Sequence, residues 1–285
     1  MTISLKQWQQ DGSYFHFNGH NLFAIKAGQG SALLLIHGFP SSSFDWIELW
    51  PALSKHYQLY ALDMLGFGLS EKPSDYNYSL KNSADQWQAY VQSQGLTEVS
   101  ILAHDYGDTV LQELLARQLE GTLPFKISKA CLLNGGIFPE ATFPILMQKL
   151  LLSRIGPLVA RLSNFKRFAK SMRSICTREL SDAHLQAHWQ LLNNHHGRLQ
   201  MPKIIQYIRE RHQFRTRWLG ALQNATIPLC LINGVDDPIS GASIVKRWRE
   251  LLPQSHVVEL HNVGHYPQWE DPEQVYLEVQ NFLGT

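Results

Sequence analysis

The chain has 285 residues, of which 44% are hydrophobic and 17% charged, and its formal net charge is +1. This balance is typical of a globular protein and excludes a disordered chain or a strongly basic nucleic-acid-binding protein. The most apolar region, residues 143–162, is too often interrupted by polar residues to span a membrane. The sequence therefore predicts a soluble, cytoplasmic protein with no nucleic-acid partner.

The termini and cysteines give a consistent picture. Residues 1–12 are polar and lack the apolar stretch of a signal peptide. Cys131, Cys176 and Cys230 are few and widely spaced, which predicts free thiols in a reducing compartment. Cys131 and Cys230 lie in apolar runs, so we expect both to be buried. We expect neither a metal nor an organic cofactor.

Short apolar runs recur along the chain and predict a mostly parallel sheet. Two alternating segments, residues 14–18 and 21–26, predict an antiparallel hairpin closed through Gly19 and His20. Six nearly continuous runs follow, as expected of strands buried on both faces. They are Ala32–Ile36, Tyr57–Leu62, Val99–Ala103, Ile127–Leu133, Pro228–Ile232 and Val257–Leu260.

Helical patterns separate these runs and predict a doubly wound α/β domain. They cover Leu80–Gln94, Val110–Leu119 with Gly121 as its C-cap, Ser243–Leu252 and Glu273–Phe282. About 95 residues between the runs ending near Leu133 and beginning near Leu229 show helical character only. A simple crossover needs only about a dozen. We therefore expect a core domain of residues 1–136 and 223–285, with a helical cap, residues 137–222, over the carboxyl ends of the strands.

The segment Ala103-His104-Asp105-Tyr106-Gly107 joins an apolar run to an amphipathic helix. A sharp strand-to-helix turn of this kind presents a nucleophile at its tip, and small residues flank the tip because the turn is tight. Asp105 is therefore the predicted nucleophile, although an aspartate at a strand end can also simply cap a helix. We expect His104 to be a packed structural residue.

Two loops are predicted to serve the nucleophile. His37-Gly38-Phe39-Pro40 follows the first parallel strand, so the backbone N–H groups of Phe39 and Tyr106 are the expected oxyanion hole. His265, on the loop after the last strand, is the expected general base. We expect the remaining histidines His256 and His261 to be exposed.

A carboxylate should orient the imidazole of His265. Gly234-Val235-Asp236-Asp237-Pro238 directly follows an apolar strand, and we favour Asp237, with Asp236 as the alternative. The resulting chain order is nucleophile, acid, histidine.

Together these motifs resemble the epoxide hydrolase and haloalkane dehalogenase branch of the α/β-hydrolases. The likeness rests on His37–Pro40, Asp63–Ser70, the elbow with aspartate at its tip, and Gly264-His265. More narrowly, the segments Asn134–Glu140, Arg217–Leu222 and His265–Gln268 are similar to those of the mesoderm-specific transcript subfamily. The resemblance runs from about Leu5 to the C-terminus and implies an α/β-hydrolase fold with an inserted cap. It does not supply a physiological substrate.

An aspartate nucleophile narrows the reaction. A carboxylate can displace a group at an sp³ carbon, and water activated by His265 then attacks the carbonyl of the resulting Asp105 ester. This chemistry favours conversion of a small, apolar epoxide to a vicinal diol, with haloalkane dehalogenation as the alternative. Dehalogenases of this branch usually carry Trp or Asn where this chain has Tyr106 and Phe39.

An epoxide oxygen needs a proton donor, and the resemblance implies two cap tyrosines. Because the cap contains only Tyr207, we expect Tyr207 to be one donor and His188, His195 or His196 to be the second. Glu210 and Arg211 would share the helix face of Tyr207. Further candidates for substrate contact are His37, Trp189 and Trp218; the two tryptophans are dehalogenase-like donors or packing residues.

A different class of protein is also open, one that keeps these residues but binds a lipid or a partner without catalysis. Phe143, Leu146, Leu150 and Leu151 would form an apolar cap face suited to either. Membrane association through this face is the less favoured expectation. For the oligomeric state, we expect a monomer or homodimer.

Overall fold

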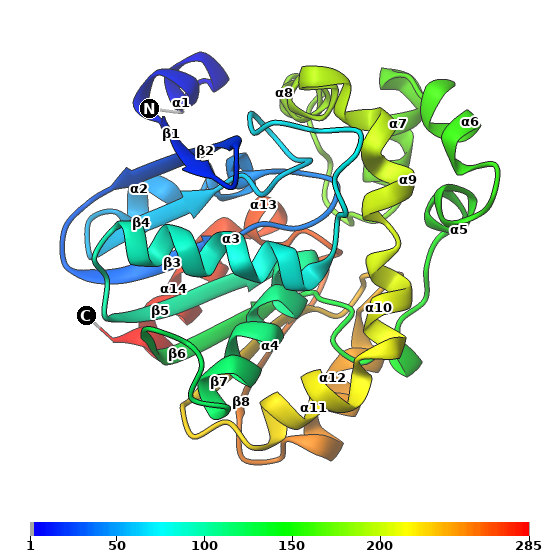
Figure 1. The fold of residues 1–285 in the computed structure, drawn as a ribbon. Coiled ribbons are helices and arrows are strands. Elements are labelled where there is room, and N and C mark those ends of the chain that lie inside the picture. The colour runs from blue at the N-terminus through cyan, green and yellow to red at the C-terminus, as the bar shows by residue number, and fades with distance from the viewer. Residues whose placement is uncertain (1–2, 285) are drawn as a thin grey trace.

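The computed structural model describes residues 3–284 as an eight-stranded sheet covered by helices on both faces (Figure 1). Met1 and Thr2 of the polar N-terminal segment lie outside the described residues. The strand order is β1-β2-β4-β3-β5-β6-β7-β8. The strands are β1 (Ser13–Phe17), β2 (His20–Ala27), β3 (Ser31–Ile36), β4 (Tyr57–Leu62), β5 (Glu98–His104), β6 (Lys126–Leu133), β7 (Leu229–Gly234) and β8 (His256–Leu260).

The pairing of the strands confirms the predicted sheet. Strands β1 and β2 form the antiparallel hairpin, and β2 also pairs antiparallel with β4. All other neighbours are parallel. The carboxyl ends of the parallel strands therefore meet at one edge of the sheet, which is where loops that carry a site belong.

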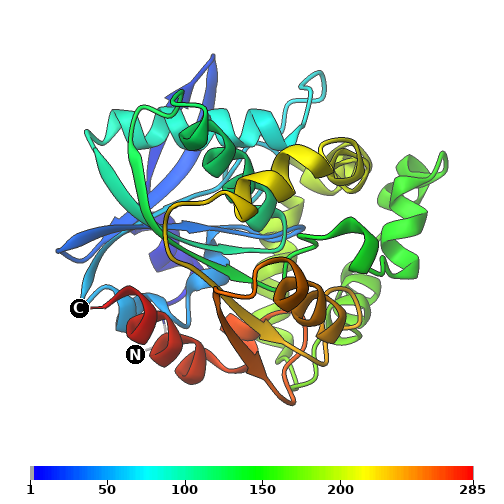
Figure 2. The same ribbon diagram turned by 90° about the horizontal axis from the view of Figure 1, so that it is seen from below.

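The helices divide between the two faces of the sheet (Figures 1 and 2). On one face lie α3 (Leu80–Ser93), α4 (Tyr106–Leu119), α11 (Arg215–Gln223) and α12 (Ala242–Leu251). On the other lie α1 (Leu5–Asp11), α2 (Trp50–Leu53) and α14 (Pro272–Leu283), with the short helices η1 (Ser43–Trp46) and α13 (Pro267–Glu270) nearby. The four helices predicted from periodicity are all present.

Alternate residues of the central strands supply the two cores, because successive side chains of a strand point to opposite faces. In β3, Leu34 and Ile36 pack beneath α3 and α4, whereas Leu33 and Leu35 face the other core. Burial on both faces explains why these runs are continuously apolar. Cys131 and Cys230 are register partners on β6 and β7, fully buried and free.

Between β6 and β7 the structure contains helices and no strand. They are η2 (Pro139–Ala141), α5 (Leu146–Leu152), α6 (Gly156–Arg161), α7 (Phe165–Arg173), α8 (Asp182–Asn193), η3 (Asn194–Gln200), α9 (Met201–Ile204), α10 (Tyr207–Gln213) and α11. By packing, α11 lies along α4 with the helices that cover the sheet. The division at residues 137 and 222 stays a prediction.

Helix α1 shows how tertiary contacts stabilise a polar segment. Its only buried residue, Trp8, packs against Phe44 and Trp50 with ring centroids 5.7 and 4.7 Å away. The side chain of Ser4 caps the helix by accepting from the N–H of Gln7. Within residues 3–284, no helix combines the length and hydropathy needed to cross a membrane.

Candidate active site

Asp105 lies at the tip of a sharp turn between β5 and α4. Its φ of 47° and ψ of −104° fall outside the conformations that residues other than glycine usually adopt. A side-chain carbon on Gly107 would lie only 2.3 Å from the carbonyl oxygen of Ile36, which explains the small flanking residue. Strain of this kind clusters at functional sites. The turn presents the carboxylate at the carboxyl edge of the sheet, where its residue is only 3% exposed.

The loop after β3 reaches the nucleophile candidate. The backbone N–H of Phe39 donates to Oδ2 of Asp105 at 3.1 Å. Buried Asp45 holds this loop, because the N–H of Gly38 and the hydroxyl of Ser41 both donate to its Oδ2, at 3.4 and 2.5 Å. Tyr106 is the first residue of α4, so its N–H belongs to the positive end of that helix.

His265 and Asp237 form a buried pair. Nδ1 of His265 donates to Oδ2 of Asp237 at 2.7 Å, so Nε2 is the nitrogen left to act as a base. Ser240 and Asn134 also donate to Oδ2 of Asp237, at 2.6 and 3.0 Å, and the N–H of Ile239 donates to Oδ1 at 2.7 Å. Four donors therefore fix the carboxylate, which in turn orients the imidazole.

Asp237 and His265 each stabilise the charged form of the other. Burial alone would raise the pKa of Asp237, but the charge and hydrogen bond of His265 outweigh burial, and the pKa lies below its ordinary value. Burial alone would lower the pKa of His265. The carboxylates of Asp237, Asp105 and Glu270 outweigh this effect, so the pKa of His265 is raised.

Asp236, the alternative acid, is exposed and accepts from the N–H of Asn262 at 2.7 Å. It ties together the loops after β7 and β8 and does not contact the His265 ring. The geometry thus favours Asp237 as the partner of His265.

We expect Asp237→Asn to slow a reaction step that uses His265 by about 10²–10⁴-fold, because the amide cannot stabilise an imidazolium. Asp236→Asn is the matched control and should change the rate only a few-fold. The measurement is the single-turnover rate of the hydrolytic step. A large loss in the Asp236 variant alone would show that the wrong carboxylate had been chosen.

Tyr207 lies on α10 and is 1% exposed. Its ring packs against those of Phe39 and Tyr106, with centroids 5.5 and 5.1 Å apart. Its hydroxyl makes no hydrogen bond of normal geometry within residues 3–284. Burial and the neighbouring Asp105 raise the pKa of the phenol, so it stays protonated. An unpaired, protonated phenol next to Asp105 is available to a substrate oxygen.

Arg211, one turn after Tyr207, is a residue that the sequence reasoning missed. Its Nη2 lies 3.3 Å from Oδ1 of Asp105 and donates to the carbonyl oxygen of Asp105 at 2.9 Å. Its Nε donates to the hydroxyl of Thr109 at 2.9 Å. The guanidinium carbon lies 4.6 Å from the centroid of the Tyr207 ring. The only signal in the sequence was the helical spacing of four residues from Tyr207.

Gly136 makes room for this guanidinium. A side-chain carbon at this position would lie 2.3 Å from Nη1 of Arg211. Because Arg211 is only 5% exposed, its charge needs the pairing with Asp105. The glycine, the arginine and the elbow therefore form one packed unit.

Several sequence candidates lie apart from this group. His37 donates from Nδ1 to the carbonyl oxygen of Gly38 at 2.8 Å and accepts at Nε2 from the N–H of Met64 at 3.2 Å, so neither nitrogen is free for substrate. The indole of Trp218 donates to Glu113 at 2.8 Å beneath α11.

The other histidines also have structural or surface positions. His188 is buried, and its ring centroid lies 4.5 Å from that of Trp269, while His195 and His196 are exposed. His104 is fully buried and donates from Nε2 to the carbonyl oxygen of His265 at 2.8 Å. His256 and His261 are exposed, as expected. No histidine of the cap shares the surroundings of Asp105 with Tyr207.

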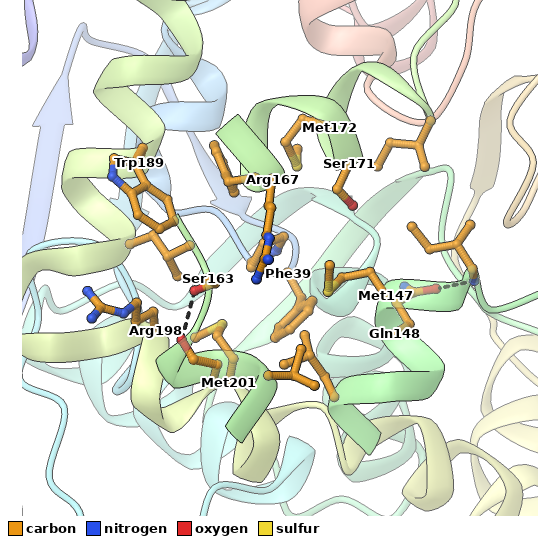
Figure 3. A pocket seen from close by; sticks show the side chains of 18 of the residues that line it. Phe39, Met147, Gln148, Ser163, Arg167, Ser171, Met172, Trp189, Arg198 and Met201 are labelled. Carbon is orange, nitrogen blue, oxygen red and sulfur yellow. Dashed lines mark hydrogen bonds between the residues drawn. The ribbon is translucent and has the colours of Figure 1, made fainter. Parts of the chain in front are cut away.

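A mostly apolar cavity with about 770 Å³ of empty space, part of it open to solvent, lies between the cap and the core (Figure 3). Phe39 and His265 line it from the core, and Trp189 contributes from α8. A smaller cavity is lined by Tyr207 and Arg211 and shares Gln148 and Ile239 with the first. Asp105 contacts lining residues of both cavities, Phe39 in one and Arg211 in the other.

Comparison with known proteins decides the family. Residues 31–272 match the family described as the alpha/beta hydrolase fold. The chain belongs to the α/β-hydrolase fold family. Its curated relatives include the mesoderm-specific transcript homolog protein of Homo sapiens, which is 38% identical over 289 residues, covering 95% of this chain and 85% of that protein. The predicted resemblance is confirmed, and the family together with its hydrolase-named relatives makes this chain a hydrolase.

Other relatives carry names of specific reactions. The cis-3-alkyl-4-alkyloxetan-2-one decarboxylase of Shewanella oneidensis is 27% identical over 278 residues, covering 93% of this chain and 86% of that protein. The structure of haloalkane dehalogenase DbeA from Bradyrhizobium elkani has a TM-score of 0.80 at 20% identity, covering 95% of this chain and 97% of that chain. Epoxide hydrolase CorEH has a TM-score of 0.75 at 21% identity, covering 95% and 98%. These two likenesses show the fold alone.

Proposed function

We propose that this α/β-hydrolase converts an epoxide to a vicinal diol through an alkyl ester on Asp105. The observation that carries the proposal is the strained elbow carboxylate, whose Oδ2 already accepts from the N–H of Phe39 at 3.1 Å. The His265–Asp237 pair supplies a base for the second step. A carboxylate nucleophile suits displacement at an sp³ carbon, because its attack on an acyl group would form an anhydride.

In the first step, a carboxylate oxygen of Asp105 attacks a ring carbon and the carbon–oxygen bond of the epoxide breaks. The electron pair passes to the ring oxygen, which takes a proton from the hydroxyl of Tyr207. Asp105 loses its negative charge when the ester forms. Arg211 then hydrogen-bonds the leaving oxygen, so the buried guanidinium still has a polar partner. Stabilisation that grows as charge develops is the part that accelerates the reaction.

In the second step, Nε2 of His265 takes a proton from water, and the hydroxide attacks the carbonyl carbon of the Asp105 ester. The N–H groups of Phe39 and Tyr106 hold the oxyanion. Its collapse breaks the bond to the alkyl oxygen, which takes the proton from His265 as the diol leaves, and the proton of the re-formed Asp105 carboxyl group returns to Tyr207. The pKa of His265 falls once the ester forms, because the Asp105 carboxylate that raised it has been neutralised. Ester formation therefore helps to release the base that the next step requires.

We expect Tyr207→Phe to lower the rate of ester formation from an epoxide by about 10²–10³-fold, the usual loss for one oxyanion donor. Hydrolysis of the ester should be nearly unchanged, because Tyr207 acts before it. Single-turnover kinetics separate the two rates, and a haloalkane is the control substrate because no oxygen needs a proton. Unchanged epoxide opening would remove Tyr207 from the mechanism.

A second candidate substrate is an oxetan-2-one, the ring named in the Shewanella oneidensis relative. The observation that favours it is Arg211, because guanidinium stabilises a carboxylate leaving group without giving up a proton. Attack of Asp105 at the sp³ carbon attached to the ring oxygen would release a carboxylate. Haloalkane dehalogenation is the other alternative; only Trp189, of the two predicted indoles, lines the cavity.

Arg211→Met is expected to slow ester formation from an epoxide or an oxetan-2-one by about 10²–10³-fold. It should also lower the free energy of unfolding by about 3–5 kcal/mol, because Asp105 loses its buried partner. Urea unfolding and single-turnover kinetics measure the two effects. Arg215→Met, which removes a half-exposed pair with Glu140, is the matched control. Faster ester formation in the Arg211 variant would show instead that Arg211 restrains the nucleophile.

Activity on the three substrate classes distinguishes the three candidate reactions. An epoxide hydrolase needs both Tyr207 and Arg211, whereas oxetan-2-one opening needs Arg211 but no proton from Tyr207. The released product identifies the reaction directly: a diol from an epoxide, a hydroxy acid or an alkene from an oxetan-2-one, and halide from a haloalkane. Failure of all three, despite a folded protein, would favour a ligand-binding protein without catalysis.

A further inference from the structure

Charge is distributed very unevenly along the chain. Residues 141–178 contain eight Lys and Arg residues and no Asp or Glu, while the rest of the chain carries the other 17 basic and all 24 acidic residues. A protein with a formal net charge of only +1 therefore concentrates positive charge in the first half of its cap. Such a concentration of positive charge attracts an anionic partner over distances of up to about one Debye length.

Most of these cations lack a carboxylate partner. Arg173 and Arg178 pair with Asp182 and Asp271, at 2.6 and 2.7 Å. The side chains without an ion pair among residues 3–284 are exposed and lie on or between α5, α6 and α7. They are Lys149, Arg154, Arg161, Lys166, Arg167 and Lys170.

Exposed apolar side chains lie among these cations. Of the nine large hydrophobic side chains exposed within residues 3–284, five fall between positions 143 and 162. Their exposed fractions are Phe143 60%, Leu146 72%, Ile155 53%, Leu158 57% and Leu162 56%. The spacing of three and four residues places the last three along one stripe of α6. Leu151, expected on this face, lines the cavity instead.

The same helices form a wall of the cavity. Twelve of its twenty lining residues come from positions 145–175. On α6, Val159 and Ala160 face the cavity, whereas Leu158 and the flanking residues Ile155 and Leu162 face outward. Arg167 is exposed, yet it also lines the cavity and points into it (Figure 3). One thin layer of helices therefore separates the apolar outer stripe from the space that reaches His265.

Helices α5 and α6 lie at one end of the molecule, opposite α1 and α14, in both ribbon views (Figures 1 and 2). Interleaved basic and apolar side chains on exposed helices are the combination that binds the interface of an anionic bilayer. We propose that the surface of α5, α6 and α7, here called the cap surface, docks on an anionic phospholipid membrane. The cavity then lies one layer of helices away from the lipid, where lipophilic substrates are concentrated.

The charge argues against two other occupants. A second copy docking through the same surface would bring the same unpaired cations face to face across a two-fold axis, which is repulsive. Phosphates of a nucleic acid would satisfy the cations but leave the apolar stripe of α6 without a partner. An anionic bilayer satisfies both, with headgroups at the cations and acyl chains at Leu158 and its neighbours.

Co-sedimentation with vesicles tests the proposal. The full chain should bind vesicles of phosphatidylcholine with phosphatidylglycerol, bind pure phosphatidylcholine much more weakly, and dissociate as salt is raised. Each basic residue near an anionic surface raises partitioning about fivefold, so Lys166→Glu with Lys170→Glu should weaken binding by at least about 25-fold. Leu158→Ser should weaken it by about tenfold or more.

Matched controls lie at the far end of the molecule. Lys55→Glu with Lys126→Glu changes the net charge equally, and Leu277→Ser removes an apolar side chain that is 43% exposed. These variants should bind like the parent, and the cap-surface variants should retain activity on a water-soluble substrate. No binding to anionic vesicles, or equal losses in the two sets of variants, overturns the proposal. Dimerisation abolished by Leu158→Ser, without vesicle binding, would show that the surface serves a second copy instead.

Discussion

Replacing Asp105 with alanine is expected to reduce kcat/KM by about 10⁴–10⁶-fold on any substrate the protein hydrolyses, as for other covalent nucleophiles. The loss is large because no other carboxylate among residues 3–284 stands at a strained elbow beside the Phe39 N–H. Since alanine also leaves Arg211 without its buried partner, Asp105→Asn is the second variant and preserves the shape of the side chain. Activity close to that of the parent in both variants would contradict the proposal that Asp105 is the nucleophile.

An isotope experiment tests the covalent step without a substitution. In a single turnover in ¹⁸O-water, the label is expected in the Asp105 carboxylate and not in the product, because water attacks the carbonyl carbon of the ester. Mass spectrometry of the peptide that contains Asp105 measures the label. Label in the product of the first turnover would mean that water attacks the substrate directly.

His265→Gln is expected to separate the two steps even more clearly. Ester formation does not use His265, whereas hydrolysis of the ester does, so the variant should accumulate the intermediate. Intact-protein mass should rise by the mass of one substrate when the substrate is an epoxide. The rate of ester hydrolysis should fall by about 10³-fold or more. An inactive, folded variant that gains no mass would place His265 before the covalent step.

The parent protein should show the matching pH dependence. Hydrolysis needs neutral His265, so its rate should rise with pH through the pKa of that imidazole in the ester. This midpoint should lie below the pKa of His265 in the free enzyme, since the free Asp105 carboxylate is among the charges that raise the latter. Rates of the two steps measured across pH give the midpoint, and NMR titration of free His265 gives the comparison.

The fold was largely readable from the sequence because its signals are local. A strand buried on both faces must be apolar throughout, so Leu33–Ile36 and its counterparts stood out as continuous runs. The tight turn at Asp105 likewise leaves a local signal, because small residues, Ala103 and Gly107, stand two positions either side of its tip. Features dictated by the chain's own geometry over five to ten residues needed no knowledge of distant parts.

Only the tertiary structure decided which side chains meet. The sequence favoured Asp237 but left Asp236 open, and packing turns Asp236 toward Asn262 and Asp237 toward His265. Arg211 and Asp105 are separated by 106 positions, and their pairing depends on how α10 rests on the carboxyl edge of the sheet. The faces of short cap helices are selected by contacts with the core and with one another, because short helices derive little stability from their own sequence. For that reason the sequence itself determined the scaffold and its elbow, and tertiary packing determined the groups that surround Asp105.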